Sequence, residues 1–89
     1  MTYEKIIHTI IDPLIENKDS VMIREVPSEN EKDITLLIVA EKDDTSRLIG
    51  RKGVVANAIR EVVSIKAKSD NKRIHVHFES FDEEGSKEE

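Results

Sequence analysis

The chain has 89 residues, a length that supports one small domain, and it contains no cysteine, which excludes disulfides and thiolate metal sites. It contains neither a secretory signal pattern nor a run of ~20 apolar residues, so we expect a cytoplasmic protein that does not enter a membrane. The formal net charge of −5 argues against a nucleic acid partner for the chain taken as a whole.

The charge is unevenly distributed along the sequence. Between Thr45 and His77 there are eight lysines and arginines but only two acidic residues, Glu61 and Asp70. Because charges more than about 8–10 Å apart are largely screened at physiological salt, the local charge of this segment decides which ligands it attracts. The segment is therefore compatible with an anionic partner.

The first predicted element is an amphipathic helix over residues 2–17. Pro13 lies inside this helix and should kink it or open its last turn, because proline has no backbone N–H to donate. The apolar residues that follow the helical spacing are Tyr3, Ile6, Ile7, Ile10, Ile11, Leu14 and Ile15.

Two strands are expected next. Residues 21–26 form the first and end at Pro27, and a polar turn over residues 28–33 leads to the most apolar run of the chain, residues 34–40. The β-branched content and short length of this run predict a central strand that is buried on both faces. The two strands together predict a hairpin.

Two helices and a third strand follow. A short helix is expected from Asp43 through Ile49, where Asp43 and Asp44 suit the positive end of the helix dipole. A longer helix is expected from Val54 to about Lys68. Alternating apolar and polar residues over 73–78 then predict a half-exposed strand.

The predicted order α-β-β-α-α-β indicates an α/β (α+β) fold with a three-stranded mixed sheet and helices packed on one face. The helix pair is long enough to return the last strand parallel to the central one. We expect residues 1–79 to form the domain. Residues 80–89 are acidic and nearly free of large apolar groups, so we expect them to form a disordered tail.

The most informative motif is Gly50-Arg51-Lys52-Gly53, between the two predicted helices. Glycine is favoured where the backbone needs a positive φ or where a ligand backbone must come close. Two cations between the glycines indicate an anionic ligand. The free N–H groups expected at the start of the next helix also favour an anion. A glycine pair alone has a second interpretation, in which Gly50 ends one helix and Gly53 is a spacer.

This loop and the order of elements resemble the K-homology (KH) domain in its type II arrangement. Residues 47–53, RLIGRKG, are similar to the signature loop of that family, and residues 54–63, VVANAIREVV, are similar to the helix after it. The other KH arrangement needs a further strand and helix after the last strand, where this chain has only an acidic tail. In one departure from the pattern, Val54 stands where small family members often have a basic residue.

The resemblance implies a single-stranded RNA-binding protein whose loop clamps the backbone of about four unpaired nucleotides. It implies that Gly50 and Gly53 let the RNA backbone approach, and that Arg51 and Lys52 supply charge. Arg47 would reach a flanking phosphate.

In the same family the bases lie in a narrow apolar groove. The resemblance assigns Leu48, Ile49 and Val55 to the wall of this groove and the strand over residues 34–39 to its floor. Few aromatic residues are present, which fits a KH groove better than RNA-binding folds that need exposed aromatic platforms.

The resemblance also implies partners and a cellular role. It implies a homodimer, a heterodimer with a larger KH protein of the KhpB (Jag) type, or both. The implied role is that of a post-transcriptional regulator or RNA chaperone linked to cell growth, division and shape. Two alternatives stay open: a protein-interaction module whose loop does not engage RNA, and a ribosome-assembly factor.

No residue pattern indicates catalysis, a cofactor or a metal ion. The serines lack the context of a nucleophile, and the carboxylates are expected in solvated turns and the tail. His75 and His77 share one face of the last strand, but no third ligand follows at a suitable spacing, so exposed strand residues are the better interpretation. We expect that the chain is not an enzyme.

Overall fold

The elements follow one another in the predicted order α-β-β-α-α-β. The computed structural model describes residues 2–26 and 28–81. The three strands form one sheet in the order β1-β2-β3, in which β1 is antiparallel and β3 parallel to β2, so the predicted fold class is confirmed. The helices and strands are α1 (Thr2–Ile11), β1 (Met22–Val26), β2 (Asp33–Ala40), α2 (Lys42–Ile49), α3 (Val54–Ser69) and β3 (Arg73–Ser80).

Helix α1 is shorter than the sequence pattern predicted, because it ends at Ile11 rather than near Asn17. Residues Asp12–Leu14 form a 3-10 turn that contains Pro13. The ring of Pro13 would clash with the carbonyl four residues earlier in an α-helix, which explains the early end. The apolar pattern nevertheless extends to Ile15, whose side chain is buried in the core. The expected effect of the proline is confirmed, and the predicted length was wrong.

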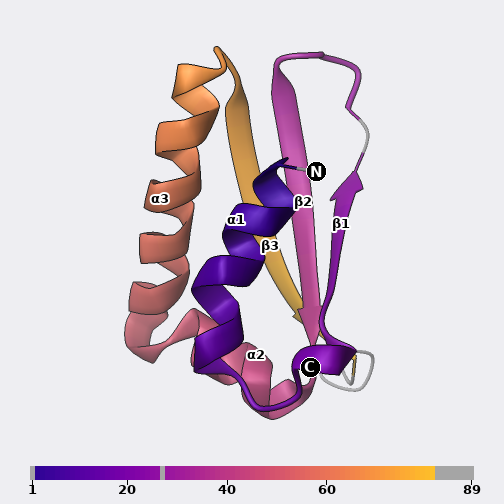
Figure 1. Ribbon diagram of the computed structural model, residues 1–89, viewed down its shortest axis with the longest axis vertical. Coiled ribbons are helices and arrows are strands. Elements are labelled where there is room, and N and C mark those ends of the chain that lie inside the picture. Colours follow the sequence, from indigo (N-terminus) through magenta and orange to yellow (C-terminus); the bar gives the residue numbers. More distant parts are fainter. Residues whose placement is uncertain (1, 27, 82–89) are drawn as a thin grey trace.

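The helices pack on one face of the sheet, where α1 lies beside α3 and α2 closes one end (Figure 1). The core lies between this helical layer and the sheet. Each fully buried apolar side chain contributes about 1.5–3 kcal/mol to stability. The largest are Ile7, Ile11, Leu36, Ile38, Leu48, Ile59 and Val63, which come from α1, β2, α2 and α3.

Strand β2 alternates between buried and half-buried positions, so the prediction that both of its faces are buried was wrong. Leu36 and Ile38 face the helices and are fully buried. Leu37 and Val39 lie on the opposite face, which none of the described helices covers. The whole run is apolar because β2 is the central strand, so that neighbours on β1 and β3 flank even its open face.

Strand β3 includes Ser80, and the backbone N–H of Phe81 then donates to the carbonyl of Ala40 at 3.0 Å. This hydrogen bond holds the end of β3 beside the end of β2. Most of the expected disordered tail, residues 82–89, lies outside the described residues. Within the described ranges, no helix is long and apolar enough to cross a membrane.

Candidate nucleic-acid interface

The glycine loop joins α2 to α3 as a tight turn. Gly50 has φ +76° and Gly53 has φ +80°, values that glycine adopts without a steric cost. Residues Arg51–Gly53 form a 3-10 turn, and the N–H of Gly53 donates to the carbonyl of Gly50 at 3.1 Å. The predicted position of the loop and the positive φ expected of its glycines are therefore confirmed.

The two glycines are needed for different reasons. A Cβ placed on Gly50 would lie 2.5 Å from Cγ2 of Val55 and 2.9 Å from its backbone nitrogen, which is closer than Cβ atoms come to such neighbours in real proteins. A Cβ placed on Gly53 would meet only Nδ2 of Asn57, at 4.0 Å. Gly50 therefore lets the loop pack against α3, whereas Gly53 leaves open surface where a ligand backbone can approach.

Arg51 and Lys52 are exposed at the tip of this loop. Within the described part of the chain, neither forms an ion pair, in contrast to Arg47, Lys66 and Arg73. Lys52 has φ +56°, a left-handed conformation that costs a residue with a side chain about 1–2 kcal/mol. The loop thus carries two free positive charges, one of them on a strained backbone.

Arg47 makes contacts different from those predicted. Its Nη1 donates to Oδ1 of Asp44 at 2.8 Å, and its Nη2 lies 3.5 Å from Oε2 of Glu16. The structure therefore places the Arg47 guanidinium against two carboxylates. A contact between Arg47 and a phosphate stays a prediction.

Asp44 is fully buried, so the general expectation that the carboxylates are solvated was wrong for this residue. It accepts the backbone N–H groups of Glu16 at 3.0 Å and Asn17 at 2.9 Å, besides the bond from Arg47. The N–H of Glu16 contributes most to holding the pKa of Asp44 below its usual value of 3.8, although burial acts in the opposite direction. Asp44 therefore ties the chain before β1 to α2, the helix that leads into the loop.

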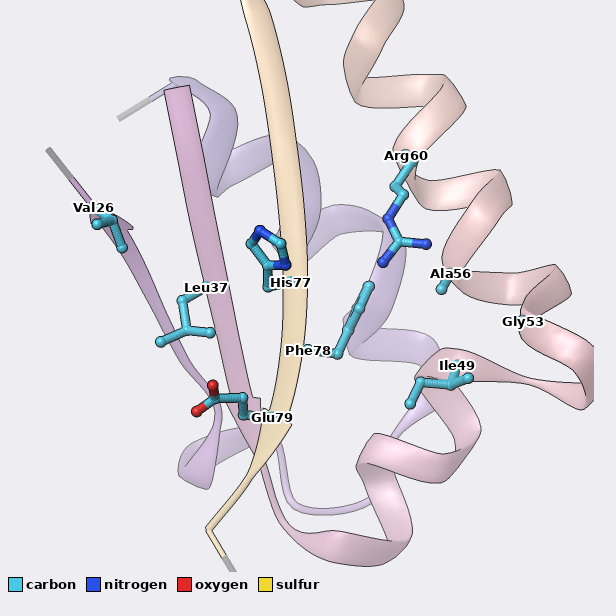
Figure 2. A pocket seen from close by; sticks show the side chains of 9 residues that line it. All are labelled: Val26, Leu37, Ile49, Gly53, Ala56, Arg60, His77, Phe78 and Glu79. Carbon is cyan, nitrogen blue, oxygen red and sulfur yellow. The ribbon is translucent and has the colours of Figure 1, made fainter. Parts of the chain in front are cut away.

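A groove of about 620 Å³ lies beside the loop (Figure 2), within the size range of ligand-binding clefts. Its helical side comes from the end of α2 and the start of α3, and its other side comes from the sheet. Most of the lining is apolar, with one cation and one carboxylate. The lining residues are Val26, Leu37, Ile49, Gly53, Ala56, Arg60, His77, Phe78 and Glu79.

The sheet side of the groove is formed mainly by β3, and the strand over residues 34–39, which was predicted to form the floor, contributes one residue to it. Three consecutive lining residues, His77, Phe78 and Glu79, belong to β3, whereas β2 contributes only Leu37. The reason is topological: β3 is the edge strand that α2 and α3 contact most, and β2 directs Ile34, Leu36 and Ile38 into the core.

The three predicted wall residues have different environments. Ile49 lines the groove and is 38% exposed, so it is available to a ligand. Leu48 is fully buried in the core, and Val55 is half-buried against the core, where it packs under Gly50. Of the three, only Ile49 borders the open space of the groove.

The sequence did not single out Arg60 and Phe78, which both line the groove and point toward one another (Figure 2). The guanidinium carbon of Arg60 lies 5.5 Å from the centre of the Phe78 ring. A signal for Arg60 was present, because Gly53, Ala56 and Arg60 are spaced i, i+3, i+7 and so share one face of a helix. That face begins at the glycine loop.

Comparison with known proteins gives one consistent result. The family model described as "KhpA/KhpB, KH domain" matches residues 4–78. The RNA-binding protein KhpA of Listeria monocytogenes is 32% identical over 75 residues, which cover 84% of this chain and 96% of that protein. KhpA of Bacillus subtilis is 35% identical over 79 residues (89% and 93%), and KhpA of Clostridium acetobutylicum is 33% identical over 75 residues (84% and 97%).

Proposed function

The chain belongs to the KhpA/KhpB family of KH domains, and on this premise we propose that it binds single-stranded RNA by clamping the RNA backbone at the loop Gly50–Gly53. The relatives at 32–35% identity are named RNA-binding proteins, and they match over nearly their whole length. This similarity supports RNA as the ligand. The geometry of the loop and the groove supports the proposed clamp, in which the loop contacts the RNA backbone and the groove receives the bases.

In the proposed complex, the sugar-phosphate backbone lies over Gly53, where no side chain blocks its approach. Arg51 and Lys52 neutralise the neighbouring phosphates, and the positive dipole end at the start of α3 favours the same anions. The bases turn into the groove, where Ile49 and the partly buried Phe78 offer apolar surface. Such a clamp holds unpaired RNA with little dependence on its overall sequence.

One observation carries the proposal: the open surface at Gly53 lies between two free cations and the mouth of an apolar groove. A loop that served only to connect two helices would need the Gly50 contact but not the empty space in front of Gly53. Nor would it need a lysine in a strained left-handed conformation.

The test is a titration of fluorescent unpaired oligoribonucleotides with the wild type and the double variant Arg51→Asp/Lys52→Asp. We expect the double variant to lose binding and to keep its melting temperature, because both side chains are exposed. The matched control is Lys5→Asp/Lys18→Asp, which makes the same change in charge at exposed positions outside the groove. A wild type that binds no unpaired RNA, or a control that loses as much affinity, contradicts the proposal.

We also propose that the protein acts as a homodimer or as a heterodimer with a KhpB-type protein. One groove contacts few nucleotides, and two linked sites can raise affinity ~10²–10⁴-fold. The exposed apolar side chains Val54, Val62 and Ile65 on α3 support association, because they are available to a partner. Analytical ultracentrifugation of the chain alone and mixed with a KhpB-type protein measures both possibilities, and a monomer in both samples contradicts them.

The proposed cellular role is post-transcriptional regulation or RNA chaperoning linked to growth and division. Crosslinking of RNA in cells to the wild type and to Arg51→Asp/Lys52→Asp tests it, with fewer crosslinked transcripts expected for the variant. Equal crosslinking favours a protein-interaction module, and cosedimentation with one ribosomal subunit favours an assembly factor. The cytoplasmic location stays a prediction.

A further inference from the structure

The groove contains a guanidinium that is held in place and still has donors to offer. Resting on the proposed RNA-binding function, we infer that Arg60 determines base specificity: it selects a base that carries two adjacent hydrogen-bond acceptors on one edge, namely guanine or cytosine. The inference follows from the anchoring of Arg60, its unused N–H groups and the shape of the surface beside it.

Arg60 is anchored by the fold rather than free in solvent. Its Nε and Nη2 both donate to the backbone carbonyl of Val76 at 3.1 Å, and its Nη1 donates to Oδ1 of Asn57 at 3.1 Å. The guanidinium also lies over the ring of Phe78, an arrangement in which the ring attracts the cation. These contacts hold the plane of the guanidinium at the edge of β3.

Arg60 has donors left after these contacts. An arginine side chain carries five N–H groups, and the contacts within the described residues use three of them. Two N–H groups remain, and the residue is exposed and lines the groove. Because the plane is already held, little side-chain entropy is lost when the remaining donors bind a ligand.

The surface between the loop and Arg60 is suited to a flat ring. Gly53 lies just before the start of α3 and Ala56 lies about one turn before Arg60 on that helix, and neither carries a side chain larger than a methyl group. A base that enters from the backbone clamp can therefore lie against this surface. Its edge then meets the guanidinium of Arg60.

The chemistry of the base edges decides which base fits. One remaining N–H donor on each of Nη1 and Nη2 can match two neighbouring acceptors, which are O6 and N7 in guanine and O2 and N3 in cytosine. Adenine places an amino donor beside each acceptor on its N6 side, and uracil places an N–H between its two carbonyls. Adenine and uracil therefore each leave one of the two remaining Arg60 N–H groups without a partner.

The experiment uses an octamer of uridine and three octamers in which one central uridine is replaced by A, G or C. We expect G or C, or both, to raise affinity about fivefold or more over the all-uridine octamer, whereas A does not. This is the lower end of the discrimination given by a bidentate arginine contact. Because the strand can slide through the clamp, a single preferred base is enough to reveal the preference.

Arg60→Lys keeps the positive charge but removes the paired N–H donors of the guanidinium. We therefore expect this variant to bind the four octamers within about twofold of one another. The matched control is Lys68→Gln, which changes an exposed cation of α3 outside the groove and should retain the preference. Circular dichroism confirms that each variant is folded. A folded Arg60→Lys variant that still discriminates overturns the inference.

A second measurement needs no change in the protein and so stays informative if Arg60→Lys does not fold. The preferred octamer is synthesised with 7-deazaguanine in place of guanine, or with 3-deazacytosine in place of cytosine, which removes one acceptor. We expect the gain over uridine to be lost, and an unchanged gain overturns the inference. Equal binding of the four natural octamers, or a preference for A or U, also overturns it, whereas no binding to any octamer overturns the proposed function itself.

Discussion

The guanidinium of Arg47 donates to the buried carboxylate of Asp44 at 2.8 Å. This bond joins a residue expected to contact RNA to the network that holds α2 in place. It leaves Arg51 and Lys52 as the cations of the loop region that are free of carboxylate partners among the described residues. The number of phosphate contacts should therefore be two rather than three.

Salt dependence tests this count. With two phosphate contacts, each contributing about −0.7 to the slope of log affinity against log salt, affinity for unpaired RNA should fall about sevenfold between 50 and 200 mM salt. Three contacts would give a fall of about twentyfold. Fluorescence anisotropy titrations at four salt concentrations measure the slope, and the steeper value would restore Arg47 to the RNA interface.

Acid should destabilise the protein through Asp44. Its pKa is lower in the folded chain than its usual value of 3.8, so the stability that its ionised form contributes is complete above that value and is lost as the pH falls below it. Asp44→Asn should lower the urea midpoint at pH 7 and flatten the decline of stability between pH 4 and pH 3. Urea unfolding at several pH values gives both quantities.

Asp70 provides the control, because the hydrogen bond that Tyr3 donates to it, at 2.6 Å, also lowers its pKa. Tyr3→Phe should therefore remove the loss of stability in acid that is due to Asp70. The loss that is due to Asp44 should stay. Burial raises the pKa of Tyr3 itself to about 12, so this hydroxyl stays protonated across the tested range. An Asp44→Asn variant with the same pH profile as the wild type would contradict the assignment.

Alanine at the two glycines should separate stability from binding. Gly50→Ala combines a positive φ with a clash against Val55, so we expect a loss of about 2–4 kcal/mol in the free energy of unfolding. Gly53→Ala has a positive φ but open space, so we expect a loss of about 1–2 kcal/mol together with weaker RNA binding. Chemical denaturation and RNA titration of both variants measure these effects. Equal losses of stability would argue against the Gly50 contact.

Lys52→Gly should stabilise the protein and weaken its binding. Glycine removes the strain of the left-handed conformation at φ +56°, and its greater freedom in the unfolded chain offsets part of that gain. We expect a net gain of up to about 1 kcal/mol. Thermal unfolding and RNA titration are the two readouts, and a variant that binds RNA as well as the wild type would remove Lys52 from the clamp.

Leu48 and Ile49 are neighbours in sequence but should respond differently to truncation. Leu48→Ala leaves a cavity in the core and should cost about 2–5 kcal/mol of stability. Ile49→Ala removes a partly exposed groove residue, so it should cost much less stability and weaken RNA binding. The pair is compared by urea unfolding and RNA titration. If Ile49→Ala destabilises the protein more than Leu48→Ala, the assignment of Leu48 to the core and Ile49 to the groove is contradicted.

Several features of this protein could be predicted because they depend on local sequence. The spacing of apolar residues distinguished helices from strands, and the glycines located the turn before α3. The end of α1 was predicted less well, since the pattern of apolar residues continues to Ile15 although Pro13 has already ended the α-helix. The spacing of apolar residues indicates which side chains reach the core. It does not indicate the backbone conformation of the segment to which they belong.

The sequence alone therefore determined the order of the elements, the mixed sheet and the loop with its two exposed cations. Only the tertiary structure decided that β3 borders the groove, that Arg47 binds Asp44 and that Arg60 is held against the carbonyl of Val76. The physical reason is that periodicity and glycine conformation are set by neighbours along the chain. The partners of a buried carboxylate or a groove arginine lie on segments that meet only after folding, such as Glu16 and Asp44, which are 28 positions apart.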